Sequence, residues 1–219
     1  LHNDVIALFD DGEELPGAFS GSRAFARNHP WMETVQVGIS LDTAVAGPIS
    51  TNETGPNNGQ LIAALARAHT GGAWTSFSGG GGYNSTPFRE AGVLVLALED
   101  NYPFKEQHTP EDRPEIVRAS SVQQMGEQTL AIARELGNRD LSNPWGPQET
   151  FFPIPLLGLA HYPEAWALPL AIAAGVLLVL ALGLALWRGF TSWRGLAVAL
   201  VMILVTAVIV GGGVSALLP

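Results

Sequence analysis

Three short apolar runs, rich in aliphatic and β-branched residues, are typical of buried strands. They span residues 4–9, 34–41 and 93–98. Acidic residues follow each run directly, at positions 10–14, 42 and 99–100. We therefore predict three strands, each of which ends at a polar loop.

Three further segments carry apolar side chains at the spacing of one helix face. They span residues 17–29, 59–69 and 120–136. His29-Pro30 should stop the first helix, and Gly137 is the expected C-cap of the third. Residues 76–83 hold four consecutive glycines and are expected to form a loop. Because strands alternate with helices, the predicted class is α/β.

The carboxyl-terminal part of the chain has a different pattern, with long stretches that lack any charge. Residues 165–187 and 195–219 contain no Asp, Glu, Lys or Arg and are rich in Leu, Ala and Val. A helix of the first length spans about 35 Å, against roughly 30 Å of bilayer hydrocarbon. We expect two transmembrane helices, with Trp166, Trp187 and Trp193 near the membrane interfaces.

The turn between the two expected spans indicates their orientation. It carries Arg188 at one end and Arg194 at the other, and these are the only charges after residue 164. Because cytoplasmic loops are enriched in Lys and Arg, the turn is predicted to be cytoplasmic. The water-facing part should then lie on the extracytoplasmic side of the membrane.

Charge and composition narrow the classes of function. The 219 residues carry a net charge of −9, and all 20 acidic residues lie within residues 4–164, which argues against a nucleic-acid partner. There is no cysteine, so thiol catalysis, disulfide scaffolds and Cys-ligated zinc are excluded. Ligands of α/β sheets gather beyond the carboxyl ends of the strands, where the acidic clusters are expected.

Four residues near these strand ends are candidates for chemistry. Glu13 and Glu14 are adjacent carboxylates, so one can bind a metal while the other acts as general base on a water. Asp42 follows an apolar strand, and His108 lies in a polar loop. Carboxylate oxygen and imidazole nitrogen together suit zinc, although each of these residues is also common in a solvated turn.

Taken in order, these motifs resemble metallopeptidase family 28, the co-catalytic zinc aminopeptidases, and in particular its membrane-bound members. The resemblance extends over most of residues 3–165. It is carried by Asp11-Gly-Glu-Glu14, Gly21-Ser22, Asp42, Glu53-Thr-Gly-Pro-Asn57, Pro87-Phe-Arg89, Ala91-Gly92, His108-Thr-Pro-Glu-Asp112, Phe151-Phe152 and His161-Tyr-Pro163.

The resemblance implies a partial three-layer α/β/α zinc-peptidase-like domain followed by two transmembrane helices. It also implies two zinc ions and hydrolysis of the N-terminal bond of a peptide substrate. Glu13 would be the general base, Glu14 and His108 would hold one zinc, and Asp42 the other. Asp112 would orient the loop that carries His108.

The predicted domain boundaries follow from this resemblance and from the charge pattern. We expect a peptidase-like domain at 1–145, a linker at 146–164, spans at 165–187 and 195–218, and a cytoplasmic turn at 188–194.

The chain departs from the family pattern in four places. The family has a His and a metal-bridging Asp upstream of its Glu pair, so we expect this chain to be the carboxyl half of a longer peptidase and to be inactive alone. The segment Tyr83-Asn-Ser-Thr-Pro-Phe88 stands where relatives often have an Asp and sometimes a His. Gln107 replaces a Tyr, and Arg113 replaces a Thr.

Two other functions fit the same residues. One is a non-catalytic ectodomain that binds peptides or holds a partner, which the Asn84 region and Gln107 favour. The other is a glutaminyl cyclase, an acyltransferase of the same fold. The retained Glu13, Glu14, Asp42 and His108 argue against the non-catalytic ectodomain, whereas a cyclase and a peptidase would be distinguished by an assay with an N-terminal glutaminyl peptide.

Overall fold

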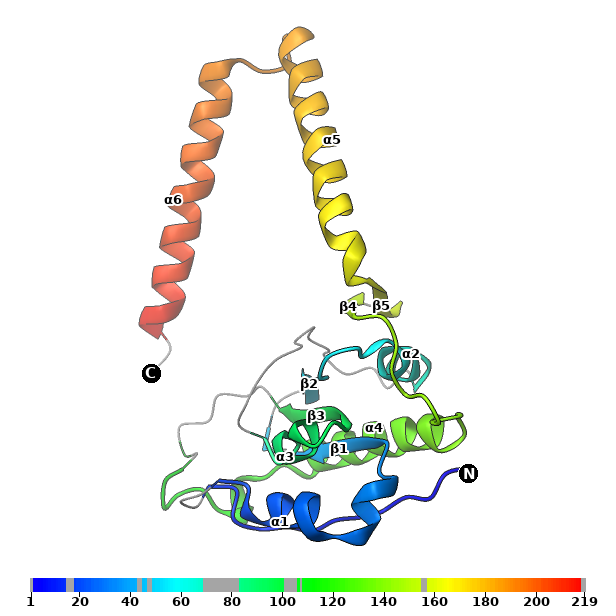
Figure 1. The fold of residues 1–219 in the computed structure, drawn as a ribbon. Helices are drawn as coiled ribbons and strands as arrows, with labels where there is room; N and C mark the ends of the chain where they lie inside the picture. The colour runs from blue at the N-terminus through cyan, green and yellow to red at the C-terminus, as the bar shows by residue number, and fades with distance from the viewer. Residues whose placement is uncertain are drawn as a thin grey trace. The chain divides into compact units, whose positions relative to one another are not determined.

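A computed structural model provides the architecture of the chain (Figure 1). The structure describes residues 2–14, 18–42, 45–46, 49–68, 83–100, 106, 108–154 and 157–217, without the side chains of 52, 53 and 207–217. These residues form two units, 1–165 and 166–219, which are treated separately below.

The first unit is a mixed α/β structure, in agreement with the predicted class. Its helices are α1 (Ser20–Asn28), α2 (Gly59–Ala68), α3 (Thr86–Glu90) and α4 (Ala119–Gly137), with short 3-10 helices at Pro30–Thr34, Pro114–Ile116 and Glu164–Trp166. Its strands are β1 (Val37–Leu41), β2 (Ile49–Glu53), β3 (Leu94–Asp100), β4 (Glu149–Ile154) and β5 (Gly158–Pro163).

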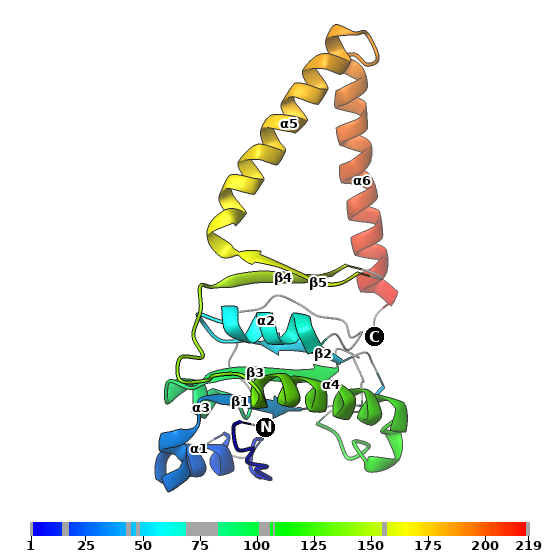
Figure 2. The same cartoon turned by 90° about the vertical axis from the view of Figure 1, so that its right-hand side faces the viewer.

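Strand β3 lies at the centre of a three-stranded sheet of order β1-β3-β2 (Figure 2). It pairs in parallel with β1, where Val37 lies opposite Leu94, and antiparallel with β2, where Ile49 lies opposite Asp100. Residues 93–98 are buried throughout, which accounts for their continuous apolar run. Because β1 and β3 are parallel, Asp42 and Glu99 lie at the same edge of the sheet.

The hydrophobic core lies between this sheet, α2, α4 and β4. Helix α2 packs against α4 and β5, and α4 contacts β2 and β3. The largest buried side chains of the core are Ile49, Leu61, Ile62, Leu65, Leu94, Leu96, Leu98, Ile132 and Phe151. These residues come from all parts of residues 49–151, so the core closes only when the whole segment is folded.

Residues 4–9, predicted as a strand, are not one. The main-chain amides of His2 and Asn3 both donate to the carbonyl of Gly137, at the end of α4. The segment that follows makes no strand pairing with the described residues, and the Phe9 side chain is exposed. An apolar run forms a strand only where it can pair with the main chain of another strand. Here the residues at the start of the chain bond the end of α4 instead.

Two other elements differ from the sequence-based expectation. The strand predicted from residue 34 begins at Val37, because Pro30–Thr34 form a 3-10 helix. The segment 146–164, expected to be a linker, contains the β4–β5 hairpin, and Phe151 of this hairpin is fully buried in the core. Most of the predicted loop at 76–83 lies outside the described residues.

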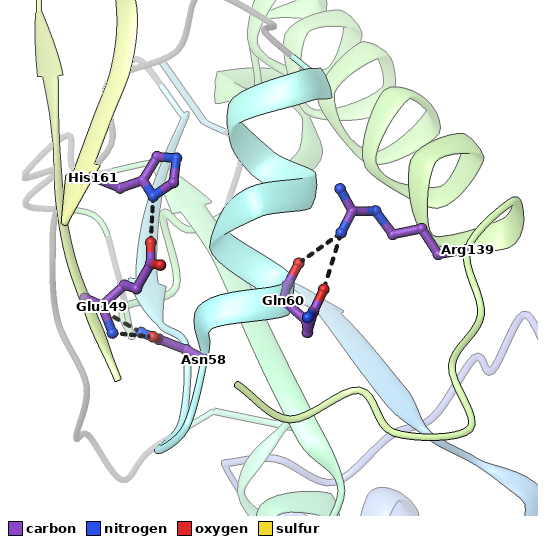
Figure 3. Close-up of polar contacts among 5 residues, drawn as sticks. All are labelled: Asn58, Gln60, Arg139, Glu149 and His161. Atoms are coloured by element: carbon purple, nitrogen blue, oxygen red, sulfur yellow. Dashed lines mark hydrogen bonds and ion pairs between the residues drawn. The ribbon is translucent and has the colours of Figure 1, made fainter. Parts of the chain in front are cut away.

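Polar contacts join the start of α2 to the segments that follow α4. Arg139 Nη1 donates to the main-chain and side-chain oxygens of Gln60 (Figure 3). A Cβ atom at Gly59 would lie 2.5 Å from the carbonyl oxygen of Pro147. Only glycine permits this close approach of two main-chain segments.

The second unit contains helices α5 (Ala167–Trp187) and α6 (Trp193–Leu217). Within the segment Glu164–Trp187, a window of 18 residues has a mean hydropathy of 2.6 and is not buried, so the segment is long and apolar enough to span a membrane. In α6 the side chains are described only as far as Thr206, and the stretch Trp193–Thr206 is apolar but shorter than a span. The second transmembrane helix therefore stays a prediction.

Candidate active site

The loop at residues 10–14, here called the acidic loop, holds Glu13 and Glu14. The Asp11 carboxylate accepts a hydrogen bond of 2.6 Å from the main-chain N–H of Gly12. Gly12 has a φ of 82°, a left-handed conformation that favours glycine. The turn at Asp11-Gly12 therefore sets the direction in which the chain reaches the two glutamates.

The beginning of α1 fixes the acidic loop from the other side. The main-chain amides of Phe19, Ser20 and Gly21 donate to the carbonyls of Glu13, Gly12 and Asp11, at 3.2, 3.2 and 3.0 Å. A Cβ atom at Gly21 would lie 2.7 Å from the Asp11 carbonyl oxygen. A glycine at the start of this helix is thus required for the loop to approach it.

A chain of side-chain hydrogen bonds connects α1, the acidic loop and the segment before α3. The buried Ser22 hydroxyl contacts both Asp10 Oδ2 and Asn84 Oδ1, the latter at 2.9 Å. Asn84 Nδ2 in turn donates to Glu13 Oε2 at 2.7 Å. Asn84 therefore holds the Glu13 carboxylate in one orientation, across 71 residues of sequence.

The surroundings of Glu13 raise the pKa of its carboxyl from 4.5 to about 7. Burial is the largest cause, and the negative charges of Asp42, Glu14 and Asp10 act in the same direction. The hydrogen bond from Asn84 acts in the opposite direction, because it stabilises the charged form. A carboxyl group with this pKa can both accept and release a proton near neutral pH.

The acidic residues at the sheet edge belong to the same electrostatic cluster. Burial and the charge of Asp42 raise the pKa of Glu99 to about 7, while a hydrogen bond from Tyr83 lowers it. Asp42 thus interacts with both Glu13 and Glu99. The acidic loop follows no strand. Through Asp42 it interacts electrostatically with the carboxyl ends of β1 and β3, where the sequence predicts a ligand site.

Asp100, the other acidic residue at the end of β3, has a structural contact. It is buried, and its Oδ2 accepts a hydrogen bond from the main-chain N–H of Ala46 at 2.9 Å.

His108 comes to Glu14 from a distant part of the chain. Its Nε2 atom lies 2.9 Å from Oε1 of Glu14, and both side chains are open to solvent. His108 has a φ of 61°, and the following Thr109 is held by its main-chain N–H and its hydroxyl, which both donate to the carbonyl of Glu106. This tight turn presents the imidazole to the acidic loop.

Asp112, the predicted orienting residue, lies in the same turn. Its main-chain N–H donates to the Thr109 carbonyl at 3.1 Å, and its side chain is exposed. Among the residues that the structure describes, none donates a hydrogen bond to this carboxylate. The orienting role of the Asp112 side chain stays a prediction.

The donor chemistry of Glu14 and His108 fits one zinc ion. Two ligands of a tetrahedral zinc, each about 2.0–2.1 Å from the metal, lie roughly 3.3 Å apart, and the observed 2.9 Å is close to that separation. Several carboxylates gathered around this pair repel one another unless a cation is bound. Within the described part of the chain, no three His, Asp or Glu side chains converge on one point. Asp42 does not form such a group with Glu14 and His108, and its role as a metal ligand stays a prediction.

The chain was compared with models of known families. The model of peptidase family M28 matches residues 1–133, which include the acidic loop, Asp42, Asn84, His108 and Asp112. The chain belongs to peptidase family M28.

Individual relatives point to the same family. The chain is 29% identical to endoplasmic reticulum metallopeptidase 1 of Homo sapiens over 154 residues, which cover 64% of this chain and 16% of the human protein. It is 27% identical to the protein of the same name from Rattus norvegicus, over 64% of this chain and 17% of the rat protein. The chain thus matches less than a fifth of the length of these relatives. No solved structure matches it.

Two residues of this hydrogen-bond chain are not predicted by the sequence. Asn84 lies in a segment that departs from the family pattern, and the structure gives it a hydrogen bond to Glu13. Ser22 belongs to a family motif, and in the structure it connects Asp10 with Asn84. A serine or asparagine carries no signal of such a role in the sequence, because its partner lies far away along the chain.

Proposed function

We propose that this chain is part of a membrane-anchored, zinc-dependent aminopeptidase that hydrolyses N-terminal peptide bonds. The observation that carries the proposal is the contact between Glu14 and His108 beside a carboxyl group, Glu13, whose pKa is raised to about 7. Membership of peptidase family M28 supports hydrolysis of peptides.

Glu14 and His108 would hold one zinc ion, and Asp42 would contribute to the second. When bound, the ions would polarise the scissile carbonyl and lower the pKa of water. Glu13 would accept a proton from the attacking water at its carboxylate and pass it to the leaving amine. Asn84 keeps one carboxylate oxygen of Glu13 occupied, so the other is available for the proton.

The remaining zinc ligands would come from residues outside this sequence. A catalytic zinc takes about three protein ligands, whereas Asp42 is one and the Glu14–His108 pair supplies two. The curated relatives are several times longer than the region that they share with this chain. The chain alone should bind zinc weakly and be inactive, and the full-length protein should be active.

The apolar helices would anchor the peptidase domain to a membrane. Helix α5 has the length and composition of a span, and α6 would return the chain across the bilayer. Arg188 and Arg194 favour a cytoplasmic position for the turn between them, which places the peptidase domain on the extracytoplasmic side.

A product analysis tests this function. The full-length protein would be incubated with a peptide that begins with leucine and with one that begins with glutamine, and the products identified by mass spectrometry. We expect release of the free N-terminal residue, and loss of this activity in Glu13→Gln, which keeps the shape of the side chain but cannot accept the proton. Formation of a cyclised N-terminus would identify a glutaminyl cyclase instead. No turnover of either peptide in a folded, zinc-loaded protein would favour a binding module.

A further inference from the structure

The β4–β5 hairpin has one face that is turned to the core and one that is not. Phe151 is fully buried, and Leu159 packs against the same core. Because side chains alternate along a strand, Phe152 and Tyr162 lie on the opposite face, where their rings are in contact with centroids 6.4 Å apart. Phe152 is 45% exposed, and Leu157 at the hairpin turn is 79% exposed.

The outer face of the hairpin consists of uncharged residues. It comprises Thr150, Phe152, Ile154, Gly158, Ala160 and Tyr162. Glu149 and His161 are the acidic and basic residues of the two strands, and both belong to the other face. Phe152 is exposed and the other five residues are partly buried, so this face offers an uncharged surface with an aromatic pair that is suited to contact with an apolar phase.

Polar contacts of Glu149 join the two strands to each other and to the residue before α2. His161 Nδ1 of β5 pairs with Glu149 Oε2 of β4, and Asn58 Oδ1 accepts from the main-chain N–H of Glu149 at 2.8 Å (Figure 3). Asn58 Nδ2 donates back to the Glu149 carbonyl at 3.3 Å. With Phe151 buried beside these contacts, the hairpin cannot turn its outer face inward without breaking the core.

The hairpin leads almost directly into the apolar helix. Strand β5 ends at Pro163 and α5 begins at Ala167, so four residue steps, about 14 Å of extended chain, separate them. Trp166, which is exposed, lies between them, and tryptophan favours the membrane–water interface. If α5 enters the bilayer, the end of β5 must lie within that distance of the interface.

We propose that the outer face of the β4–β5 hairpin, with Phe152 and Tyr162, lies in the interfacial region of the lipid bilayer, together with Leu157 of the hairpin turn. The inference rests on the proposed membrane anchoring by α5. The hairpin then acts as a second point of attachment beside the span, and it fixes the orientation of the peptidase domain on the membrane. Because the outer face carries no cationic side chain, the contact should form with uncharged phosphatidylcholine and persist at high salt.

Site-specific fluorescence in vesicles tests this contact. This chain has no cysteine, so one thiol can be introduced and labelled once any cysteines outside it have been replaced by serine. The probes are Phe152→Cys and Leu157→Cys on the hairpin, with Val122→Cys, a 52% exposed site on α4, as the matched control. Val179→Cys, 69% exposed on α5, reports on the span itself. Each full-length variant carries an environment-sensitive dye in phosphatidylcholine vesicles that contain nitroxide-labelled lipid.

We expect a blue shift and loss of fluorescence at both hairpin positions, stronger when the nitroxide is near the headgroup than near the end of the acyl chain. The probe at 179 should show the opposite depth preference, and the probe at 122 should not be quenched. Quenching at 179 without quenching at 152 and 157 would overturn the hairpin contact and leave the anchor intact. A blue shift at 152 and 157 without quenching would overturn it in favour of a protein partner. No quenching at 179 would overturn the anchoring and the inference together.

Discussion

The Nε2 atom of His108 lies 2.9 Å from Oε1 of Glu14, although 94 residues separate them along the chain. Two exposed side chains so far apart in sequence meet only because the acidic loop and the 106–110 turn are each held by their own main-chain hydrogen bonds. The pair combines imidazole and carboxylate, the donor types that zinc prefers.

Removal of the Asn84 side-chain amide should weaken Glu13 as the general base. The amide N–H of Asn84 stabilises the charged Glu13 carboxylate, so Asn84→Ala raises the pKa of Glu13 further. More of the base is then protonated at mildly acidic pH, and the acid limb of the pH–rate profile moves to higher pH. We expect kcat/KM there to fall by about tenfold, the scale of one hydrogen bond to a charged group.

Asn138→Ala is the matched control for this substitution, because within the described part of the chain Asn138 Nδ2 bonds only the Arg134 carbonyl, at the exposed end of α4. It should leave the profile unchanged. An Asn84→Ala profile identical to the wild type would show that Asn84 does not act on Glu13.

A methyl group at residue 21 should disturb the acidic loop. The added Cβ of Gly21→Ala meets main-chain atoms of Asp11 at 2.7 and 2.9 Å, and these cannot move without displacing Glu13 and Glu14. We expect peptidase activity to fall by more than tenfold, since a displacement of about 1 Å in a catalytic group has effects of that size or larger. Steady-state kinetics of the full-length protein measures this loss.

Gly126→Ala serves as the control, because nothing lies within 4 Å of its added Cβ on α4. There alanine should stabilise the helix by about 0.5–1 kcal/mol and leave the kinetics unaltered. Equal activity of the two variants would mean that the loop tolerates the methyl group at 21.

Two adjacent phenylalanines should differ sharply in their effect on stability. Phe151 is fully buried in the core, so Phe151→Ala should cost about 3–5 kcal/mol of the free energy of unfolding. Phe152 faces outward, and Phe152→Ala should change the unfolding free energy of the detergent-solubilised protein by less than about 1 kcal/mol. Denaturant titration of both variants provides the comparison. Similar losses would contradict the orientation of the hairpin.

Stability of the metal-free protein should depend on the ionisation of Glu99. Its pKa is about 7 in the folded chain and 4.5 ordinarily, so between these values the folded state binds more protons than the unfolded state. The stabilising contribution of the protonated carboxyl is fully present below about pH 4.5 and is lost as the pH rises through 7. After chelation, Glu99→Gln should therefore raise the Tm more at pH 8 than at pH 5. A shift of equal size at both pH values would exclude this electrostatic origin.

The sequence predicted the elements that carry a continuous or long periodic signal. Helix α4 and strand β3 were found nearly to their ends, because α4 is long enough to show its periodicity and β3 is buried on both faces. Strand β2 was missed, since Ile49-Ser-Thr-Asn-Glu53 has no apolar run and owes its conformation to pairing with β3. The hairpin was missed because Pro153 and Pro163 argue against strands, although both are tolerated in a two-stranded ribbon.

The grouping of these residues into one candidate site is predicted from the resemblance to a family and not from their spacing in the sequence. Glu13 and Glu14 are adjacent, but nothing in their spacing relates them to His108, whose approach depends on the fold. The contact of Asn84 with Glu13 could not be predicted for the same reason. The raised pKa of Glu13 arises from burial and from Asp42, neither of which a linear sequence displays.

Zinc content tests the central assignment most directly. The full-length protein would be purified beside Glu13→Gln, Glu14→Ala and His108→Ala, and zinc per chain measured by mass spectrometry after exhaustive dialysis. We predict about two zinc ions in the wild type and in Glu13→Gln, which lacks only the base, and about one fewer in Glu14→Ala and His108→Ala. Equal zinc in all four proteins, or none in a folded wild type, would contradict the assignment of Glu14 and His108 as ligands of one ion.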